Sequence, residues 1–315
     1  MKVFVSGSTG FVGANIARRF LSEGWEVHIS VRRGANTWRL HDVLDQMQVH
    51  ELDLLDYPAL CSTMEKVRPH SIIHLATYGA YPRIQTDLDK IFETNMVGTL
   101  NLVRASDKVK YESFINTSSS SEYGLVKKYM AEGDLPAPVN YYGATKAGAT
   151  IFCQVHTKIT GAPIVTTRLF SVFGPFEEST RLVPSTIRKC LLNQELEFTS
   201  GLQKRDFIYT QDIEDAYLEL VRRPELKGEV INIGTGRQYD VRSMVEAIIA
   251  ETKTTSKPAW AKLATDESGD FYWVADTSKA DRLLKWKPRH SLKEGVKKSV
   301  EWVRQNLQFY AEKGE

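Results

Sequence analysis

Short runs of consecutive apolar residues alternate along this chain with longer segments in which apolar residues recur every three or four positions. The short runs predict buried strands, and the longer segments predict helices. Runs such as VFVSG and SIIHLA are apolar at successive positions, which is typical of a parallel sheet covered by helices on both faces. The pattern therefore predicts a doubly wound α/β fold. Its predicted strands are residues 2–6, 26–31, 49–52, 71–75, 113–117 and 163–169.

A glycine-rich loop joins the first predicted strand to the first predicted helix, with the sequence Gly7-Ser8-Thr9-Gly10-Phe11-Val12-Gly13. Glycine allows a tight turn and a close approach of backbone amides to a pyrophosphate, which the positive end of the following helix also stabilises. Because strand, loop and helix occur in the required order, a dinucleotide site is favoured over a plain turn. The loop residues expected to line the cofactor are Gly7, Thr9, Gly10, Phe11, Val12 and Gly13.

The end of the second predicted strand indicates which dinucleotide binds. A carboxylate there suits the ribose of NAD(H), whereas a basic residue suits the 2′-phosphate of NADP(H). This strand ends in Arg32 and Arg33, whose guanidinium groups can make fork-shaped contacts with a phosphate. NADP(H) is therefore favoured, and NAD(H) is the alternative if both arginines are merely solvated. Asp53 and Leu54 follow the third strand, where Asp53 would either accept from the adenine amino group or cap the strand.

The alternation of strands and helices changes after Phe173-Gly174-Pro175 into mixed short elements. Residues 229–233 predict one more strand, which would return the chain to the first sheet. We expect residues 1–170 to form a dinucleotide-binding Rossmann domain, rejoined by about 206–233. Residues 171–315 are then expected to form mainly a smaller C-terminal α/β lobe that binds the substrate.

Tyr142 and Lys146 stand four residues apart, so on a helix they would share one face. A cation beside a phenol favours the phenolate, so Lys146 is expected to lower the pKa of Tyr142 from about 10 towards neutrality. Tyr142 would then serve as an acid–base group. Pairs of this kind also arise by chance on solvated surfaces. Here the pair follows an apolar strand ending in four serines at 118–121, where a hydroxyl can bind the same substrate oxygen.

The charge balance and the cysteines exclude several classes of function. The 41 Lys and Arg residues nearly match the 39 Asp and Glu residues, so no overall positive field favours nucleic acid. Cys61, Cys153 and Cys190 lack a CxxC or a His-rich context, which indicates reduced thiols and no metal site. The sequence lacks the charged-then-apolar order of a signal peptide. It also contains no apolar run that approaches the roughly 18 residues of a membrane span. A cytoplasmic protein without a membrane partner is expected.

Together these motifs resemble the extended short-chain dehydrogenase/reductase family of nucleotide-sugar epimerases, dehydratases and reductases. The likeness extends to His74-Leu75-Ala76, to Tyr123-Gly124 after the serine run, and to Arg205-Asp206-Phe207-Ile208-Tyr209. In that family the hydroxyl partner lies four residues before the tyrosine of the Tyr-Gly step, which implies Ser119 here. The resemblance also implies that Arg205 meets the substrate diphosphate. The implied cofactor contacts beyond the glycine loop are Leu75, Ala76, Thr77, Phe170 and Val172.

Departures from the family pattern narrow the implied chemistry. The family's 4,6-dehydratases carry an acidic pair just after the hydroxyl residue, where this chain has Ser120 and Ser121. Glu122 follows one position late, which disfavours dehydration. The family's Asn after Arg168 is Ser171 here, and its Arg-Pro-Gly-Asp segment is Glu267-Ser268-Gly269-Asp270. The expected contacts with the sugar nucleotide are Tyr78, at the start of a candidate segment 78–83, together with Ser119, Ser120, Ser171, Arg205 and Asp270.

The leading hypothesis is an NADPH-dependent reductase of a nucleotide-linked 4-keto sugar, with hydride from the nicotinamide and a proton from Tyr142. Lys146 would hold the cofactor ribose, and Ser119 would hydrogen-bond the carbonyl oxygen as negative charge develops there. The alternative is a 4-epimerase that uses the same trio and retains its NAD(P). A cofactor sensor without catalysis is disfavoured because all three residues are present. Surplus apolar positions in 88–103 and 142–155 predict a homodimer, unless the second lobe covers them.

Overall fold

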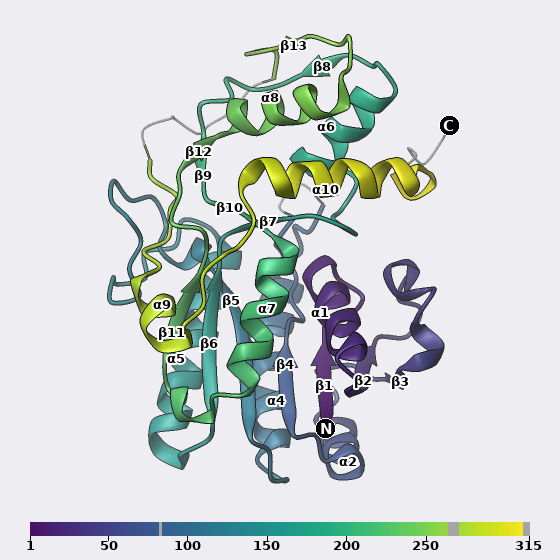
Figure 1. The fold of residues 1–315 in the computed structure, drawn as a ribbon. Helices are drawn as coiled ribbons and strands as arrows, with labels where there is room; N and C mark the ends of the chain where they lie inside the picture. The colour runs from purple at the N-terminus through teal and green to yellow at the C-terminus, as the bar shows by residue number, and fades with distance from the viewer. Residues whose placement is uncertain (82–83, 264–270, 311–315) are drawn as a thin grey trace.

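The computed structural model describes residues 1–81, 84–263 and 271–310. Its centre is a seven-stranded parallel sheet with the strand order β11-β6-β5-β4-β1-β2-β3. This arrangement confirms the doubly wound α/β fold (Figure 1). The strands of the sheet are β1 (Lys2–Ser6), β2 (Glu26–Val31), β3 (Gln48–Glu51), β4 (Ser71–His74), β5 (Ser113–Ser119), β6 (Ile164–Leu169) and β11 (Val230–Ile233).

Alternate residues of each strand point into two separate cores. Val3 and Val5 of β1 pack in one core with α1 (Phe11–Ser22), α7 (Thr210–Val221) and α9 (Ser278–Leu284). Phe4 points to the opposite core, beneath α2 (Tyr57–Val67), α4 (Gly98–Ser106) and α5 (Tyr141–Thr160). Both faces of the sheet are therefore buried, which explains the continuous apolar runs in the sequence.

A further group of helices lies beyond one end of the sheet (Figure 1). It consists of α6 (Leu182–Leu191), α8 (Val241–Thr252) and α10 (Leu292–Gln305), which share a third core with Phe173, Phe207 and Tyr209. Two short strand pairs lie between this group and the sheet: β7 (Ser171–Phe173) with β10 (Phe207–Tyr209), and β9 (Lys204–Arg205) with β12 (Tyr239–Asp240). A third pair, β8 (Leu196–Glu197) with β13 (Pro258–Ala259), lies at the far end of the group (Figure 1).

The predicted strands agree with the observed ones to within two residues at each end, and the strand predicted at 229–233 is β11, which pairs with β6. A short helix, α3 (Leu88–Phe92), continues through a π-helical turn, Glu93–Val97, into α4. The functional division near residue 170 into a dinucleotide-binding domain and a substrate-binding lobe stays a prediction.

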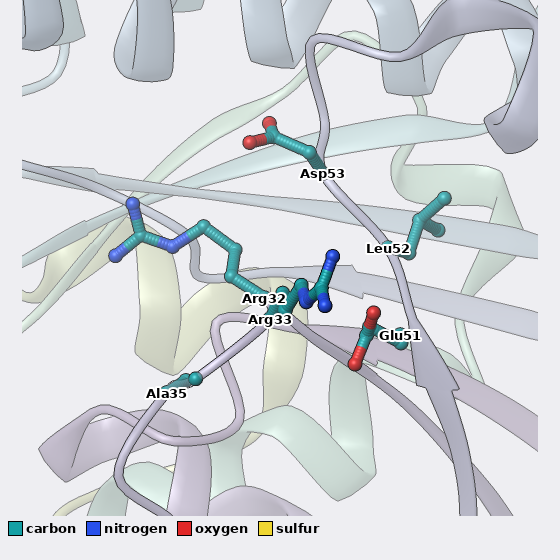
Figure 2. A pocket seen from close by; sticks show the side chains of 7 residues that line it. Arg32, Arg33, Ala35, Glu51, Leu52 and Asp53 are labelled. Carbon is teal, nitrogen blue, oxygen red and sulfur yellow. The ribbon is translucent and has the colours of Figure 1, made fainter.

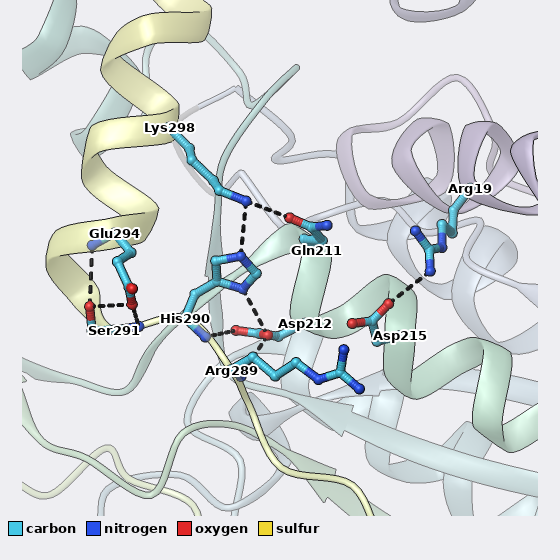
Figure 3. A network of polar contacts seen from close by, with 9 residues as sticks. All are labelled: Arg19, Gln211, Asp212, Asp215, Arg289, His290, Ser291, Glu294 and Lys298. Carbon is cyan, nitrogen blue, oxygen red and sulfur yellow. Dashed lines mark hydrogen bonds and ion pairs between the residues drawn. The ribbon is translucent and has the colours of Figure 1, made fainter.

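A buried carboxylate joins α7 to the segment that leads into α10. Asp212 accepts hydrogen bonds from the backbone amide of Arg289 at 2.8 Å and from His290 Nδ1 at 2.9 Å. Lys298 of α10 contacts the other ring nitrogen of His290 at 3.1 Å (Figure 3). Asp212, which follows the Arg205–Tyr209 motif in the sequence, therefore has a structural role that holds the third core against the sheet.

Candidate active site

The glycine loop packs directly against the end of β4. Gly7 has a φ of +74°, and a Cβ there would lie 2.4 Å from the backbone nitrogen of Ala76. A Cβ on Gly13 would lie 2.2 Å from the carbonyl oxygen of Gly7. Gly10 precedes α1 as its N-cap and supplies no side chain, and the first turn of α1 contains no acidic residue. The positive end of α1 is therefore open to an anion, as a pyrophosphate site requires.

A pocket of about 500 Å³ lies at the carboxyl ends of β2 and β3. Arg32, Arg33, Glu51 and Asp53 line it with exposed side chains, and Figure 2 shows the two arginines near Glu51, Leu52 and Asp53. Within the described part of the chain, neither arginine side chain forms a hydrogen bond or an ion pair. Asp53 caps the strand end, because its Oδ1 accepts from the amide of Leu55 at 2.9 Å. Leu54 is buried against α4, and its carbonyl accepts from Asn101 at 3.0 Å.

The segment after β4 is held by an asparagine that sequence reasoning missed. Asn95 is fully buried in the π-helical turn, where its Oδ1 accepts from Thr77 Oγ1 and from the amide of Tyr78, both at 2.9 Å. Its Nδ2 donates to the carbonyl of Tyr78 and to Thr145 of α5, also at 2.9 Å. Asn95 therefore fixes the end of β4 against the helix that carries Tyr142 and Lys146. A signal was present in the sequence, since a buried polar residue in the middle of an apolar helix requires partners.

The structure brings Ser119, Tyr142 and Thr77 together. Ser119 ends β5, and Tyr142 lies in the first turn of α5, whose N-cap Asn140 accepts from the amide of Gly143 at 2.7 Å. Ser119 and Thr77 lie close enough to the Tyr142 hydroxyl to act on its pKa as hydrogen-bond partners. Ser119 Oγ donates to Ser121 Oγ at 3.1 Å, and Thr77 Oγ1 donates to Asn95. Three strand and helix ends therefore present hydroxyl groups to one point at the carboxyl edge of the sheet, where ligands bind in this type of fold.

The protonation of Tyr142 differs from the expectation drawn from the sequence. Burial raises the pKa of Tyr142 above its usual value of 10.0, and this effect exceeds the lowering by its hydrogen bonds to Ser119 and Thr77. The prediction that Lys146 lowers the pKa of Tyr142 is therefore wrong for this structure. Arg181, just before α6, is instead the cation that acts to lower the pKa of Tyr142. Its guanidinium lies 5.5 Å from the ring of Tyr81, and sequence reasoning did not single it out.

Lys146 is deeply buried beneath the site. Its ammonium donates to the carbonyl oxygen of Thr117 at 2.5 Å. Burial lowers the pKa of Lys146 to about 8, and the nearby carboxylate of Glu122 opposes that shift. Tyr142 and Lys146 lie on the same helix, as the spacing predicts, but their side chains have different surroundings.

The residues expected to meet the substrate have diverse environments. Ser120 is buried and accepts from the indole of Trp273 at 2.9 Å, and the guanidinium of Arg205 lies over the same indole at 5.3 Å. Lys90 lies 4.8 Å from the ring centre of Tyr78. Ser171 begins β7 and is partly exposed. Phe170, which follows β6, is buried, and Val172 in β7 is partly buried, whereas Asp270 lies outside the described residues.

Glu122, the carboxylate that follows the serine run, is completely buried. Its Oε2 accepts from Arg168 Nε at 2.8 Å and from Nη2 at 2.7 Å, and its Oε1 accepts from Thr150 at 2.6 Å and from Ser118. Every lone-pair direction is thus occupied by the protein. Glu122 is therefore unsuited to exchange a proton with a substrate.

The sequence model of the NAD dependent epimerase/dehydratase family matches residues 3–234. The chain belongs to this family. One similar protein is a CDP-abequose synthase of Salmonella muenchen, which is 26% identical over 95% of this chain and 97% of the relative. Another is a human dTDP-D-glucose 4,6-dehydratase, which is 30% identical over 75% of this chain and 69% of the relative. A similar solved structure is a UDP-glucuronic acid 4-epimerase from Bacillus cereus with UDP-glucuronic acid and NAD. It is 26% identical, with a TM-score of 0.86 over 97% of this chain and 100% of that one.

Membership in the epimerase/dehydratase family establishes a nucleotide-sugar enzyme with a dinucleotide fold, and it leaves the direction of chemistry open. Across residues 1–81, 84–263 and 271–310, no cluster of His, Cys, Asp or Glu is placed to hold a metal ion. In the same ranges, no helix has the length and apolar character to cross a membrane.

Proposed function

We propose that this enzyme is an NADPH-dependent reductase of a nucleotide-linked 4-keto sugar. The observation that carries the proposal is the pair of exposed arginines, Arg32 and Arg33, at the pocket where β2 and β3 end. Because their guanidinium groups have no protein partner among the described residues, they are available to a 2′-phosphate. The open N-terminus of α1 and the side-chain-free Gly10 fit the pyrophosphate of the same cofactor.

The protein's own groups suit reduction. The raised pKa of Tyr142 keeps its phenol protonated at neutral pH, so Tyr142 donates a proton to the oxygen of the substrate carbonyl. Ser119 donates a hydrogen bond to that oxygen, where negative charge develops. Lys146 would hold the cofactor ribose. When bound, the dinucleotide supplies the hydride.

The same geometry argues against dehydration. Elimination of water needs an acid and a base beside the hydroxyl residue, and positions 120 and 121 are serines here. Glu122 has its oxygens held by Arg168, Thr150 and Ser118, so it does not replace the missing carboxylates.

The proposal is tested with purified protein, NADPH and a panel of nucleotide-linked 4-keto-6-deoxysugars. We expect loss of the nicotinamide absorbance in step with formation of the reduced sugar nucleotide. Absence of turnover with every ketone of the panel would exclude the reductase. NADH, which lacks the 2′-phosphate, serves as the control cofactor and is expected to support much slower turnover than NADPH.

A 4-epimerase with retained NAD(P) is the second candidate. The likeness to the Bacillus cereus UDP-glucuronic acid 4-epimerase favours it, because that structure holds NAD with a sugar nucleotide on the same fold. Such an enzyme would convert a sugar nucleotide to its 4-epimer without added cofactor. It would also copurify with a tightly bound dinucleotide, which the reductase would not.

Replacing Arg32 with alanine is expected to weaken NADPH binding by about 10- to 100-fold and to leave NADH binding nearly unchanged. The reason is the loss of a charge-assisted contact worth about 1.5–3 kcal/mol. Isothermal titration with each dinucleotide measures the effect. The control is Arg222→Ala, an exposed arginine at the end of α7. Equal weakening of NADPH and NADH by Arg32→Ala would contradict the assignment.

We further propose that the enzyme is a homodimer that joins through α5 and α3. Ile151, Val155 and Ile159 form an exposed apolar row along α5, and Leu88 and Phe92 of the neighbouring α3 are also exposed. Exposed apolar rows of this extent favour a protein partner. We also place the protein in the cytoplasm, where the free thiols of Cys61, Cys153 and Cys190 stay reduced.

Placing charges in this row is expected to separate the dimer. The double variant Ile151→Glu, Val155→Glu should sediment with the mass of one chain at a concentration where the unaltered protein has twice that mass. Leu135→Glu, which alters an exposed apolar residue in the loop before α5, is the control. A single-chain mass for the unaltered protein would refute the dimer.

A further inference from the structure

The buried carboxylate of Glu122 lies where the elements of the catalytic trio meet. Its donors come from three different elements: Ser118 on β5, Thr150 on α5 and Arg168 on β6. Arg168 and Ser118 are themselves paired across the two strands. One side chain therefore cross-links the central strands of the sheet to the catalytic helix.

Two of these three donors lie next to a catalytic residue in their own element. Ser118 directly precedes Ser119 in β5. Thr150 lies four residues after Lys146 in α5, so both side chains project from the same face of that helix. The distance of 2.6 Å between Thr150 Oγ1 and Glu122 Oε1 fixes that face against the turn that follows Ser119. A shift of the carboxylate would consequently move Ser119 and Lys146 relative to each other.

The charge of Glu122 also acts on Lys146. Lys146 is 2% exposed, and its ammonium donates to the neutral carbonyl of Thr117. The other titratable groups that interact with it are Cys153, whose thiol pKa is raised to about 12, and His74, whose pKa is lowered to about 3. Both are neutral at pH 7, as is the neighbouring phenol of Tyr142. Glu122, paired with Arg168, is therefore the anion that offsets the burial of Lys146.

We propose that Glu122 is a positioning residue of this active site, which keeps the buried Lys146 charged and holds it in place relative to Ser119. The proposal rests on the proposed function only in assigning Lys146 to the catalytic trio. Glu122 acts through Lys146, since its own oxygens are occupied by protein donors. The charge-conserving change Glu122→Asp is thus distinguishable from the isosteric but neutral change Glu122→Gln.

The test is the titration of Lys146 in the full chain without substrate or dinucleotide. Lysine labelled with ¹³C at Cε is followed by NMR across pH, and the Lys146 signal is identified by its loss in Lys146→Met. We expect a midpoint near 8 in the unaltered protein. Glu122→Gln should lower that midpoint by about one pH unit, whereas Glu122→Asp should leave it close to the original value. An unchanged midpoint in Glu122→Gln would overturn the proposal.

Two further variants separate charge from structure. Thr150→Val removes a hydrogen bond to Glu122 and keeps the carboxylate, so it should leave the Lys146 midpoint in place. A midpoint lowered as far as in Glu122→Gln would show that packing, not charge, is responsible. If Glu122→Gln leaves Arg168 unpaired and fails to fold, the double variant Glu122→Gln, Arg168→Met removes both charges. It should still lower the midpoint, but by less than Glu122→Gln alone, because loss of the Arg168 cation partly offsets loss of the anion; an unchanged midpoint would overturn the proposal.

This readout is independent of turnover. If no 4-keto sugar is reduced but the Lys146 midpoint falls in Glu122→Gln, the proposed reductase is wrong and the role of Glu122 stands. If turnover is observed and the midpoint does not move, the role of Glu122 is wrong and the reductase stands. In the active enzyme, Glu122→Gln should also shift the alkaline limit of kcat downward and change KM little.

Discussion

Replacing Tyr142 with phenylalanine is expected to lower kcat by roughly 100- to 10,000-fold, the usual contribution of a positioned acid–base group. The phenol hydroxyl is the group on which Ser119 and Thr77 converge, and phenylalanine removes it while the ring stays beside Gly79. NADPH binding should change little, because the contacts of its phosphates lie at the glycine loop and at Arg32. Steady-state kinetics with the 4-keto substrate and titration with NADPH measure the two effects separately.

The neighbouring tyrosine offers a matched control for this variant. Tyr141 begins the same helix but is exposed, so Tyr141→Phe should retain nearly full activity. A Tyr142→Phe enzyme with more than about a tenth of the original kcat would contradict the role of Tyr142 as proton donor.

A second large effect is expected from Gly13→Val in the glycine loop. Any Cβ at this position lies 2.2 Å from the carbonyl oxygen of Gly7, so the loop or the start of α1 must move. If about 3 kcal/mol of this strain opposes cofactor binding, the affinity for NADPH falls roughly 100-fold. Isothermal titration and thermal unfolding together report the loss of affinity and of stability.

The control for the loop is a glycine with free space around it. A Cβ on Gly133 would meet no atom within 4 Å, and its φ is not positive, so Gly133→Ala should bind NADPH normally. Gly13→Val binding as tightly as the unaltered chain would show that the loop does not form the cofactor site.

The features predicted correctly from the sequence are those set by local patterns. The parallel strands follow from apolar runs buried on both faces, as Val3, Phe4 and Val5 illustrate by pointing into opposite cores. The helical position of Tyr142 and Lys146 follows from spacing alone. The backbone conformation of Gly7 likewise follows from its place in a strand-to-helix turn.

The features that escaped prediction depend on contacts between distant segments. The pKa of Tyr142 is raised by desolvation, which depends on segments far apart in the sequence and outweighs the lowering by its partners Ser119 and Thr77. The hydrogen bond from Trp273 to Ser120 joins residues 153 positions apart, which the sequence pattern does not indicate, and the substrate contact of Ser120 stays a prediction. The role proposed for Glu122 depends on its contacts with Ser118, Thr150 and Arg168, which the sequence alone does not bring together.

The most direct test of the proposed reduction is the fate of deuterium carried at the transferable position of NADPH. Under single-turnover and multiple-turnover conditions, the reductase should place one deuterium on C4 of the sugar for each NADPH consumed. Failure to consume NADPH with the 4-keto sugar, together with conversion of a 4-hydroxy sugar nucleotide to its 4-epimer without deuterium at C4, would contradict the reductase and establish the epimerase instead.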